Sequence, residues 1–398
     1  MTSAEPLRVA MIGHAFMGRA HTQAWKTAGR FFALPRPVET AVIVGHNAER
    51  ATKAAEALEW QESSDDWRAT IARDDIDIVD ICTPGDTHAE VAIAALQAGK
   101  HVMCEKPLAN TVAEAEAMTA AAEEAFARGV VSMCGFTYRR TPALAYAKQL
   151  VAEGKLGTIR HIRGVYLQDW LSDPMSPWSW RMDKELAGSG ALGDIGAHVV
   201  DAAEYVTGLT VRGVSGMLET FVTERPVAGG IEGGLGGRGA EGAEMKPVTV
   251  DDAAVFTARF SDADGHPSNA VATFEATRFA LGRKNALRLE INGDQGSLAF
   301  DFEDMNALDY FDGSRPAEEQ GFTRILVTEP THPWTGNWWP PGHGLGYEHG
   351  FTHQVVDLVS AIDSATQPRP SFADALHINK VLAAVQDSAW HESRFTLV

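Results

Sequence analysis

Cysteine is scarce in this chain, and its three residues, Cys82, Cys104 and Cys134, form no Cys-x-x-Cys pair. An odd number of scattered cysteines indicates neither a disulfide scaffold nor a thiolate zinc site. Positively charged residues are also few. The chain has 34 Lys and Arg residues against 53 Asp and Glu residues, which gives a net charge of -19. A surface of this sign repels phosphate, which disfavours nucleic acid as a partner. We expect a protein of the reducing cytoplasm.

Long hydrophobic runs are absent as well. The first apolar run, Leu7 to Ile12, is too short for a secretory signal or a membrane span. We therefore expect no targeting segment and no membrane partner. The remaining composition, 45% apolar and 22% charged over 398 residues, is typical of a globular protein with enough chain for two or three domains.

Residues 1–140 alternate short apolar runs with alanine-rich helical stretches. Continuous apolar runs of this length are typical of parallel strands that helices cover on both faces. The pattern predicts an N-terminal doubly wound α/β domain of the Rossmann type. The expected strands are 7–12, 41–44, 76–82, 101–104 and 130–136, and the expected helices are 18–28, 48–58, 88–98 and 111–127.

Residues 141–371 contain strands without a comparable helix between most of them. Several of these runs alternate in polarity, as strands with one solvated face do. We predict an α+β second domain on an open, mostly antiparallel sheet, whose exposed face favours a homodimer or homotetramer. A mobile, glycine-rich surface loop is expected at 226–247 and a closing helix within 372–398. The expected elements are a helix at 142–153, strands at 159–167, 211–221, 248–260, 270–276 and 287–292, and a last helix at 372–391.

A glycine-containing turn follows the first expected strand and leads directly into a helix. Small residues there let the backbone approach a pyrophosphate, which the N–H groups and dipole of the helix N-terminus can bind. Ala15 occupies the middle glycine position, so its methyl group must fit beside the phosphates. An ordinary turn is the alternative, but the βαβ pattern that follows favours dinucleotide binding. The candidate phosphate-binding residues are Gly13, Ala15, Phe16, Met17 and Gly18.

The second expected strand ends without the acidic residue that normally binds the adenine ribose. Gly45, His46 and Asn47 stand at this point instead. Without a carboxylate to repel a 2′-phosphate, His46 or Arg50 could approach that group in NADP, whereas Asn47 could hydrogen-bond the ribose of NAD. Both cofactors stay open, and Arg50 is equally consistent with a solvated helix residue.

Lys106 follows the expected strand 101–104 in the sequence Glu105-Lys106-Pro107. This order places the lysine at the carboxyl edge of a parallel sheet, where ligands bind in such folds. A lysine there can donate a hydrogen bond to a substrate oxygen. The alternative is a surface salt bridge with Glu105.

Asp194 and His198 are four residues apart in a segment rich in small residues. If the segment is helical, the two side chains share a face, and the carboxylate can orient the imidazole. A histidine held this way is a credible general base for a secondary alcohol. The alternatives are a helix-capping Asp194 and a buried structural histidine. A metal site is not expected, because no further ligand falls at a suitable spacing.

Aromatic residues near this segment are candidates for carbohydrate contacts. Trp170 and Trp180 precede Asp194 in loop-like surroundings, and Tyr347 is a weaker candidate. Flat apolar rings with polar neighbours suit the C–H faces of a sugar ring. Packing against the sheet or in an oligomer interface is an equally good explanation for any one of them.

In combination, these motifs resemble the glucose-fructose oxidoreductase and inositol dehydrogenase family of nicotinamide-dependent sugar oxidoreductases. The resemblance spans nearly the whole chain, and 166–170, 180–181 and 188–201 look most like the levoglucosan dehydrogenase branch. Ala15, Gly45 and Gly85 depart from the family pattern, which often has Asn at the last position. The motifs that carry the resemblance are Gly13 to Gly18, Thr83-Pro84 with His88, Glu105-Lys106-Pro107, Tyr138-Arg139 and the segment from Asp194 to His198.

The resemblance implies an enzyme that oxidises a secondary hydroxyl of a pyranose-type sugar or anhydrosugar with NAD or NADP, NAD being slightly favoured, and without a metal. Alternatives are an inositol dehydrogenase, glycoside cleavage through transient oxidation, and a cofactor-sensing protein without catalysis. The implied catalytic residues are Lys106, Asp194 and His198. The implied further cofactor contacts are Thr83, Pro84, His88, Glu105 and Lys106, and the implied substrate contacts are Lys106, Tyr138, Arg139, Gln168, Trp170, Trp180, Arg181, Asp194, His198 and Tyr347.

Overall fold

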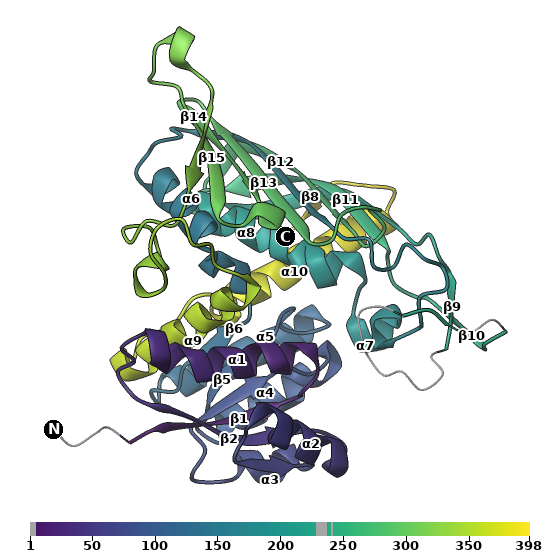
Figure 1. Ribbon diagram of the computed structural model, residues 1–398. Coiled ribbons are helices and arrows are strands. Elements are labelled where there is room, and N and C mark those ends of the chain that lie inside the picture. The colour runs from purple at the N-terminus through teal and green to yellow at the C-terminus, as the bar shows by residue number, and fades with distance from the viewer. Residues whose placement is uncertain (1–4, 228–236, 240–241) are drawn as a thin grey trace. The chain divides into compact units, whose positions relative to one another are not determined.

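The computed structural model describes residues 5–227, 237–239 and 242–398 (Figure 1). The chain forms two compact units, one of Met1–Thr137 with Tyr347–Asn379 and one of Tyr138–Gly346 with Lys380–Val398. The first break lies three residues before the predicted boundary at 140. Much of the glycine-rich loop predicted at 226–247 lies outside the described residues.

The first unit contains a six-stranded parallel sheet in the order β3-β2-β1-β4-β5-β6. This is the doubly wound order, in which ligands bind at the carboxyl ends of β1 and β4, where the strand order reverses. The parallel sheet confirms the predicted fold class of this half. Its strands are β1 (Leu7–Ile12), β2 (Val38–Val44), β3 (Glu62–Ser64), β4 (Ile78–Ile81), β5 (His101–Cys104) and β6 (Ser132–Cys134).

Local capping signals position several helices of this unit. Asn47 and Asp66 cap their helices by accepting a backbone N–H, and Thr111 with Glu114 forms a capping box. The helices are α1 (Phe16–Phe31), α2 (Ala48–Leu58), α3 (Trp67–Ile71), α4 (His88–Gln97), α5 (Val112–Phe126) and α9 (Tyr347–Ser364), with the first part of α10 (Phe372–Trp390).

Helix α9 was not predicted, and the predicted boundaries placed its residues in the second domain. Its side chains Phe351, Val355 and Leu358 are buried in one apolar cluster with Val9 and Met11 of β1. Helix α9 also runs beside α1 in Figure 1. A segment distant in sequence therefore completes the core of the nucleotide-binding fold.

The second unit contains a nine-stranded sheet in the order β16-β15-β14-β13-β7-β12-β11-β8-β17. All neighbouring pairs are antiparallel except β7 with β12, which confirms the predicted, mostly antiparallel sheet. The strands are β7 (Ile159–Leu167), β8 (Thr210–Glu219), β11 (Ala253–Ser261), β12 (Pro267–Thr277), β13 (Ala286–Gly293), β14 (Gly296–Asp301), β15 (Ala307–Asp312), β16 (Phe322–Leu326) and β17 (Thr396–Leu397), beside a separate pair, β9 (Glu224–Pro226) and β10 (Met245–Pro247).

Helices α6 (Pro142–Ala152) and α8 (Ala197–Thr207) cover one face of this sheet (Figure 1). Gly164 of β7 permits the close approach of α8, because a Cβ at this position would lie 2.7 Å from Val199 of that helix. The short helix α7 (Lys184–Ala187) precedes the segment that leads into α8. Among the residues that the structure describes, no helix is both long and apolar enough to cross a membrane.

Candidate active site

The glycine-containing turn joins β1 to α1 as predicted. Gly13 has a φ of 100°, and a Cβ there would lie 2.8 Å from the Cys82 carbonyl oxygen, so only glycine fits. Ala15 is the N-cap of α1 with a φ of -75°, a conformation that its methyl group tolerates. Within the described chain, no side chain caps α1, and its first turn has no acidic residue. Its N–H groups therefore fit the pyrophosphate of a dinucleotide.

The end of β2 carries imidazole and guanidinium groups where an acid is usual. A Cβ on Gly45 would overlap the imidazole of His14, so His14 fills the space in which an acidic side chain would begin. Burial lowers the pKa of His14, and the nearby His46 and Arg50 act in the same direction. Asn47, a predicted ribose contact, uses its Oδ1 to accept the Arg50 N–H at 3.0 Å and caps α2. These groups fit the ribose end of a nicotinamide dinucleotide.

Lys106 lies at the carboxyl edge of the parallel sheet, two residues after the end of β5. His88 holds the neighbouring loops together, since its Nε2 is 2.9 Å from the Thr83 carbonyl and its Nδ1 is 3.1 Å from the Pro107 carbonyl. The Lys106–Pro107 peptide bond is cis. The structure thus brings the predicted residues of the 83–88 and 105–107 segments to one edge.

Asn110 and Gly85 explain one departure from the family pattern. A Cβ on Gly85 would overlap the amide of Asn110, so this amide occupies the space beside Gly85. An asparagine side chain from a different position in the chain therefore lies where a side chain at position 85 would begin. Sequence reasoning missed Asn110, because no local pattern relates it to Gly85.

The second unit places His198 next to two tyrosines. The rings of Tyr138 and Tyr166 lie 4.6 and 6.0 Å from the imidazole, measured between centroids. His198 is the second residue of α8, and the preceding turn, Leu192–Gly196, is a π-helix rather than the regular helix on which the predicted Asp194–His198 pairing depends. Turns of this kind are frequent at functional sites.

A buried carboxylate positions this π-helical turn. Asp251 accepts the N–H groups of Gly190 and Leu192, both at 2.7 Å. Sequence reasoning missed Asp251, since the contact joins segments about 60 residues apart, as the separations of 61 and 59 show. The anchor fixes the backbone immediately before Asp194.

A hydrogen-bonded chain extends from the His198 side of the unit. The hydroxyls of Tyr138 and Tyr166 are 2.5 Å apart, and the Tyr166 hydroxyl donates to Asn285 Oδ1 at 2.6 Å. Gln168 Nε2 donates to the same oxygen at 2.8 Å, and Trp170 Nε1 donates to Gln168 Oε1 at 2.9 Å. Three predicted substrate residues are thereby connected through Tyr166 and Asn285, which had not been predicted as site residues.

Asp194 lies beside two arginines. Its Oδ2 is 3.9 Å from a terminal nitrogen of Arg278, a fully buried residue whose guanidinium also faces the Trp170 ring at 5.7 Å. Burial lowers the pKa of Arg181, while the charge of Asp194 opposes this shift. Arg181 also stacks over Trp180 at 4.5 Å. The predicted role of Asp194 in orienting His198 stays a prediction, and Arg278 is a further site residue that sequence reasoning missed.

Arg139 and Tyr347 are engaged by other groups. Arg139 forms a bidentate pair with Asp201 of α8, at 2.9 and 2.6 Å, which favours a role in fixing α8. Tyr347 belongs to the first unit and stacks on Phe16 at 6.2 Å, beside the glycine-containing turn. Substrate contact by either residue stays a prediction.

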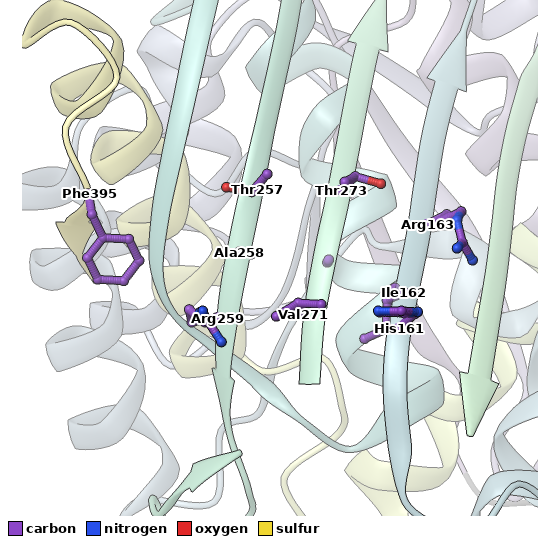
Figure 2. Close-up of a pocket in the computed structure, with 10 residues that line it drawn as sticks. His161, Ile162, Arg163, Thr257, Ala258, Arg259, Val271, Thr273 and Phe395 are labelled. Carbon is purple, nitrogen blue, oxygen red and sulfur yellow. The ribbon is translucent and has the colours of Figure 1, made fainter. Parts of the chain in front are cut away.

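A hollow of about 470 Å³ lies elsewhere, on strands β7, β11 and β12 (Figure 2). Side chains alternate across a strand, so His161 and Arg163 point away from the face on which Gly164 receives α8. The hollow therefore belongs to the sheet face opposite α8, and none of the predicted site residues lines it. Its lining residues are His161, Ile162, Arg163, Thr257, Ala258, Arg259, Val271, Ala272, Thr273 and Phe395.

Comparisons with known proteins match both parts of the chain. Residues 7–133 match the oxidoreductase family with an NAD-binding Rossmann fold, and residues 144–299 match the GFO/IDH/MocA C-terminal domain. A levoglucosan dehydrogenase from Pseudarthrobacter phenanthrenivorans is 43% identical over 391 residues, which is 97% of this chain and 97% of the relative.

Solved structures resemble the chain over its full length. An oxidoreductase domain protein from Kribbella flavida has a TM-score of 0.92 and 57% identity, with 99% of this chain and 100% of the other covered. A levoglucosan dehydrogenase in complex with NADH and levoglucosan has a TM-score of 0.90 and 39% identity, with 99% and 100% covered.

Proposed function

Because this chain belongs to the GFO/IDH/MocA family of oxidoreductases, we propose that it oxidises a secondary hydroxyl of a pyranose-type sugar or anhydrosugar to a ketone with NAD. One observation supports this most strongly. The imidazole of His198 lies beside a chain of hydrogen-bonding groups that runs from the Tyr138 hydroxyl to the indole of Trp170. Such a mixture of a potential base, hydroxyls, amides and flat rings suits a ring carrying several hydroxyl groups. Levoglucosan, which a relative's name specifies, is the first candidate.

The first unit would hold the cofactor. The uncapped N-terminus of α1 would bind the pyrophosphate, and His14, Asn47 and Arg50 stand where the adenine ribose would lie. When bound, NAD supplies the nicotinamide carbon that accepts the hydride. The end of β2 has no carboxylate to repel a 2′-phosphate, which makes NADP the second candidate.

Three residues would take up the hydroxyl proton and stabilise the charge that develops in the reaction. In the proposed reaction, the C–H bond of the ring carbon breaks and its hydride leaves for the cofactor, while the hydroxyl proton passes to His198. Asp194 would orient and charge-stabilise the imidazole, and Lys106 would donate a hydrogen bond to the reacting oxygen. The ring carbon becomes a ketone carbon, and one proton and one hydride account for the two hydrogens removed.

The test is absorbance at the reduced-nicotinamide band, with purified protein, levoglucosan, glucose, other pyranosides and inositols, and either NAD or NADP. We expect the absorbance to rise with a pyranose or anhydrosugar. In His198→Gln the rate of this rise should be lower by ~10² or more, the scale of general base catalysis. A rise with inositols alone would contradict the proposed substrate class. Cofactor binding without turnover would favour a sensing protein, and glycoside cleavage without net reduced cofactor would favour transient oxidation.

We further propose that the chain forms a homodimer or homotetramer through the sheet face opposite α8. Met217 of β8 and Val255 of β11 are cross-strand neighbours there, with exposed fractions of 60% and 46%. Phe395 borders the hollow in Figure 2. Both Phe395 and Leu397, two residues further along the chain, are exposed apolar residues. Exposed apolar groups gathered on one face favour burial against another protein surface.

We also propose a reducing compartment, the cytoplasm. In the part of the chain that the structure describes, the three cysteines are buried and form no disulfide, and burial raises the pKa of the Cys82 thiol to about 12.

A further inference from the structure

His21 is a buried residue of α1 that the reaction scheme above does not use. Its side chain is 1% exposed, and both ring nitrogens face carboxylates. Nδ1 lies 2.9 Å from both carboxylate oxygens of Asp80 in β4, and Nε2 lies 3.0 Å from Glu105 Oε1, just after β5. One imidazole thus joins the helix that follows the glycine-containing turn to the ends of two central strands.

The two carboxylates have further partners, which fix their orientation. Asp80 accepts the indole N–H of Trp25 at 2.7 Å. The second oxygen of Glu105 accepts the backbone N–H of Lys106 at 3.2 Å. Gly135 leaves space for this carboxylate, because a Cβ there would lie 2.6 Å from Glu105 Oε1. A continuous path of hydrogen bonds therefore runs from His21 through Glu105 to the peptide group of Lys106.

This geometry suits a protonated imidazole. A neutral histidine carries one N–H, whereas the protonated ring carries two and can donate to both carboxyl groups at once. Burial is the largest single effect and lowers the pKa of His21, but the interactions with Asp80 and Cys82 together outweigh it, so the pKa is raised well above the usual 6.5. Charge-assisted bonds of this kind are shorter and stronger than neutral ones, and they hold a single geometry.

We propose that His21 is a positioning residue for the reaction: it holds the Glu105 carboxylate, which in turn fixes the backbone of Lys106. The inference rests on the proposed function, in which Lys106 binds the reacting oxygen. Glu105, which the family resemblance assigned to cofactor binding, acts in this account through Lys106 instead. A lysine side chain delivers its ammonium accurately only when its own backbone is fixed, and small displacements of reacting groups are costly in rate.

The kinetic test compares His21→Gln with Trp60→Phe. Gln can donate to one carboxylate but not across both, whereas Trp60→Phe removes a buried indole bond to Thr22, the next residue of α1, without touching the path. We expect His21→Gln to lower kcat by roughly 10- to 100-fold, with NADH affinity changed by less than about threefold. Trp60→Phe is expected to lower the melting temperature but to keep kcat. Equal kcat in His21→Gln and wild type, or a loss of kcat that matches a loss of NADH affinity, would overturn the proposal.

A second measurement does not depend on turnover and so separates failure of this inference from failure of the proposed function. Amide hydrogen exchange at Lys106 is expected to accelerate by about 10-fold or more in His21→Gln and in Glu105→Leu, while Val102 of β5 stays protected. Glu105→Leu removes both acceptor oxygens at a similar side-chain volume and covers the case in which His21→Gln does not fold. Unchanged exchange at Lys106 in the folded variants would overturn the proposal, whatever the sugar panel shows.

Discussion

Gly13 lies in the turn before α1, and Gly29 lies in the last turns of that helix. The backbone geometry requires a glycine at the first position but not at the second. Gly13 has a positive φ and faces the Cys82 carbonyl, whereas a Cβ on Gly29 of α1 would meet only Leu34 at an ordinary 3.6 Å. The turn that precedes α1 therefore depends on glycine, and the last turns of the helix do not.

Alanine substitutions at these positions should act in opposite directions. Gly13→Ala is expected to strain the backbone by about 1–3 kcal/mol and to weaken NADH binding at least tenfold, because the turn must shift. Gly29→Ala is expected to stabilise the chain by about 0.5–1 kcal/mol without changing NADH affinity. Denaturant unfolding and fluorescence titration measure both effects. Equal NADH affinity in the two variants would contradict the proposed phosphate site.

Lys106 is the residue on which the proposed chemistry depends most. Replacing it with Met keeps the length of the side chain and removes its charge and hydrogen bonds. Turnover is expected to fall by ~10² or more, with NADH affinity roughly intact. Steady-state kinetics and an NADH titration provide the measurement, and Lys53→Met, on the exposed face of α2, is the control. Near-wild-type turnover of Lys106→Met would rule out its role.

At the scale of elements, the placement of His198 depends on how α8 is anchored. Arg139 forms a bidentate pair with Asp201, whose side chain is 2% exposed, and Asp251 holds the turn before the helix. Both anchors come from segments outside α8, so tertiary contacts rather than helix propensity fix the position of the imidazole.

Breaking the Arg139–Asp201 pair should therefore cost stability. Asp201→Asn is expected to lower the free energy of unfolding by about 3 kcal/mol, because a mostly buried guanidinium loses its charged partner. Replacing the pair by Met and Leu together should restore much of this loss. The exposed Lys53–Glu49 pair of α2 is the control, with an expected effect below about 1 kcal/mol on replacing Glu49 by Gln. A similar loss at both pairs in urea unfolding would contradict the anchoring role.

The sequence predicts best those elements whose signal is local. Strands 7–12, 101–104 and 159–167 and helix 48–58 are confirmed with the predicted bounds, because apolar runs and capping residues mark them directly. Strand β3, helix α9 and the π-helical turn were missed. The sequence of β3 is polar, α9 is defined by its packing on β1, and a π turn has no distinct periodicity.

The residues of the candidate site also differ in whether a local sequence signal marks them. Lys106 and the glycine-containing turn could be placed from the sequence, because each follows a strand of a parallel sheet. Asp251, Arg278 and Asn285 could not be found, since they meet the site through contacts between distant segments. The contact of Glu105 with His21 joins the end of β5 to α1, and only the folded unit brings these segments together.

At the scale of the whole molecule, the proposed assembly depends on the sheet face opposite α8. Val255→Asp places a charge beside Met217 on this face. The expected result is a shift from oligomer to monomer in light scattering, because an unpaired charge would have to be buried in the interface. Phe126→Asp, at an exposed apolar position on α5, should leave the oligomeric state unchanged. A wild-type monomer, or an unaltered oligomer in Val255→Asp, would contradict the proposal.

Deuterium transfer tests the central claim of sugar oxidation most directly. The protein is incubated with NAD and levoglucosan that carries deuterium on its ring carbons, and the mass of the reduced cofactor is measured. If a ring carbon bearing a secondary hydroxyl is the hydride donor, the reduced cofactor carries one deuterium, and Lys106→Met yields far less of it. Unlabelled reduced cofactor, or none at all with any sugar of the panel, would contradict the account.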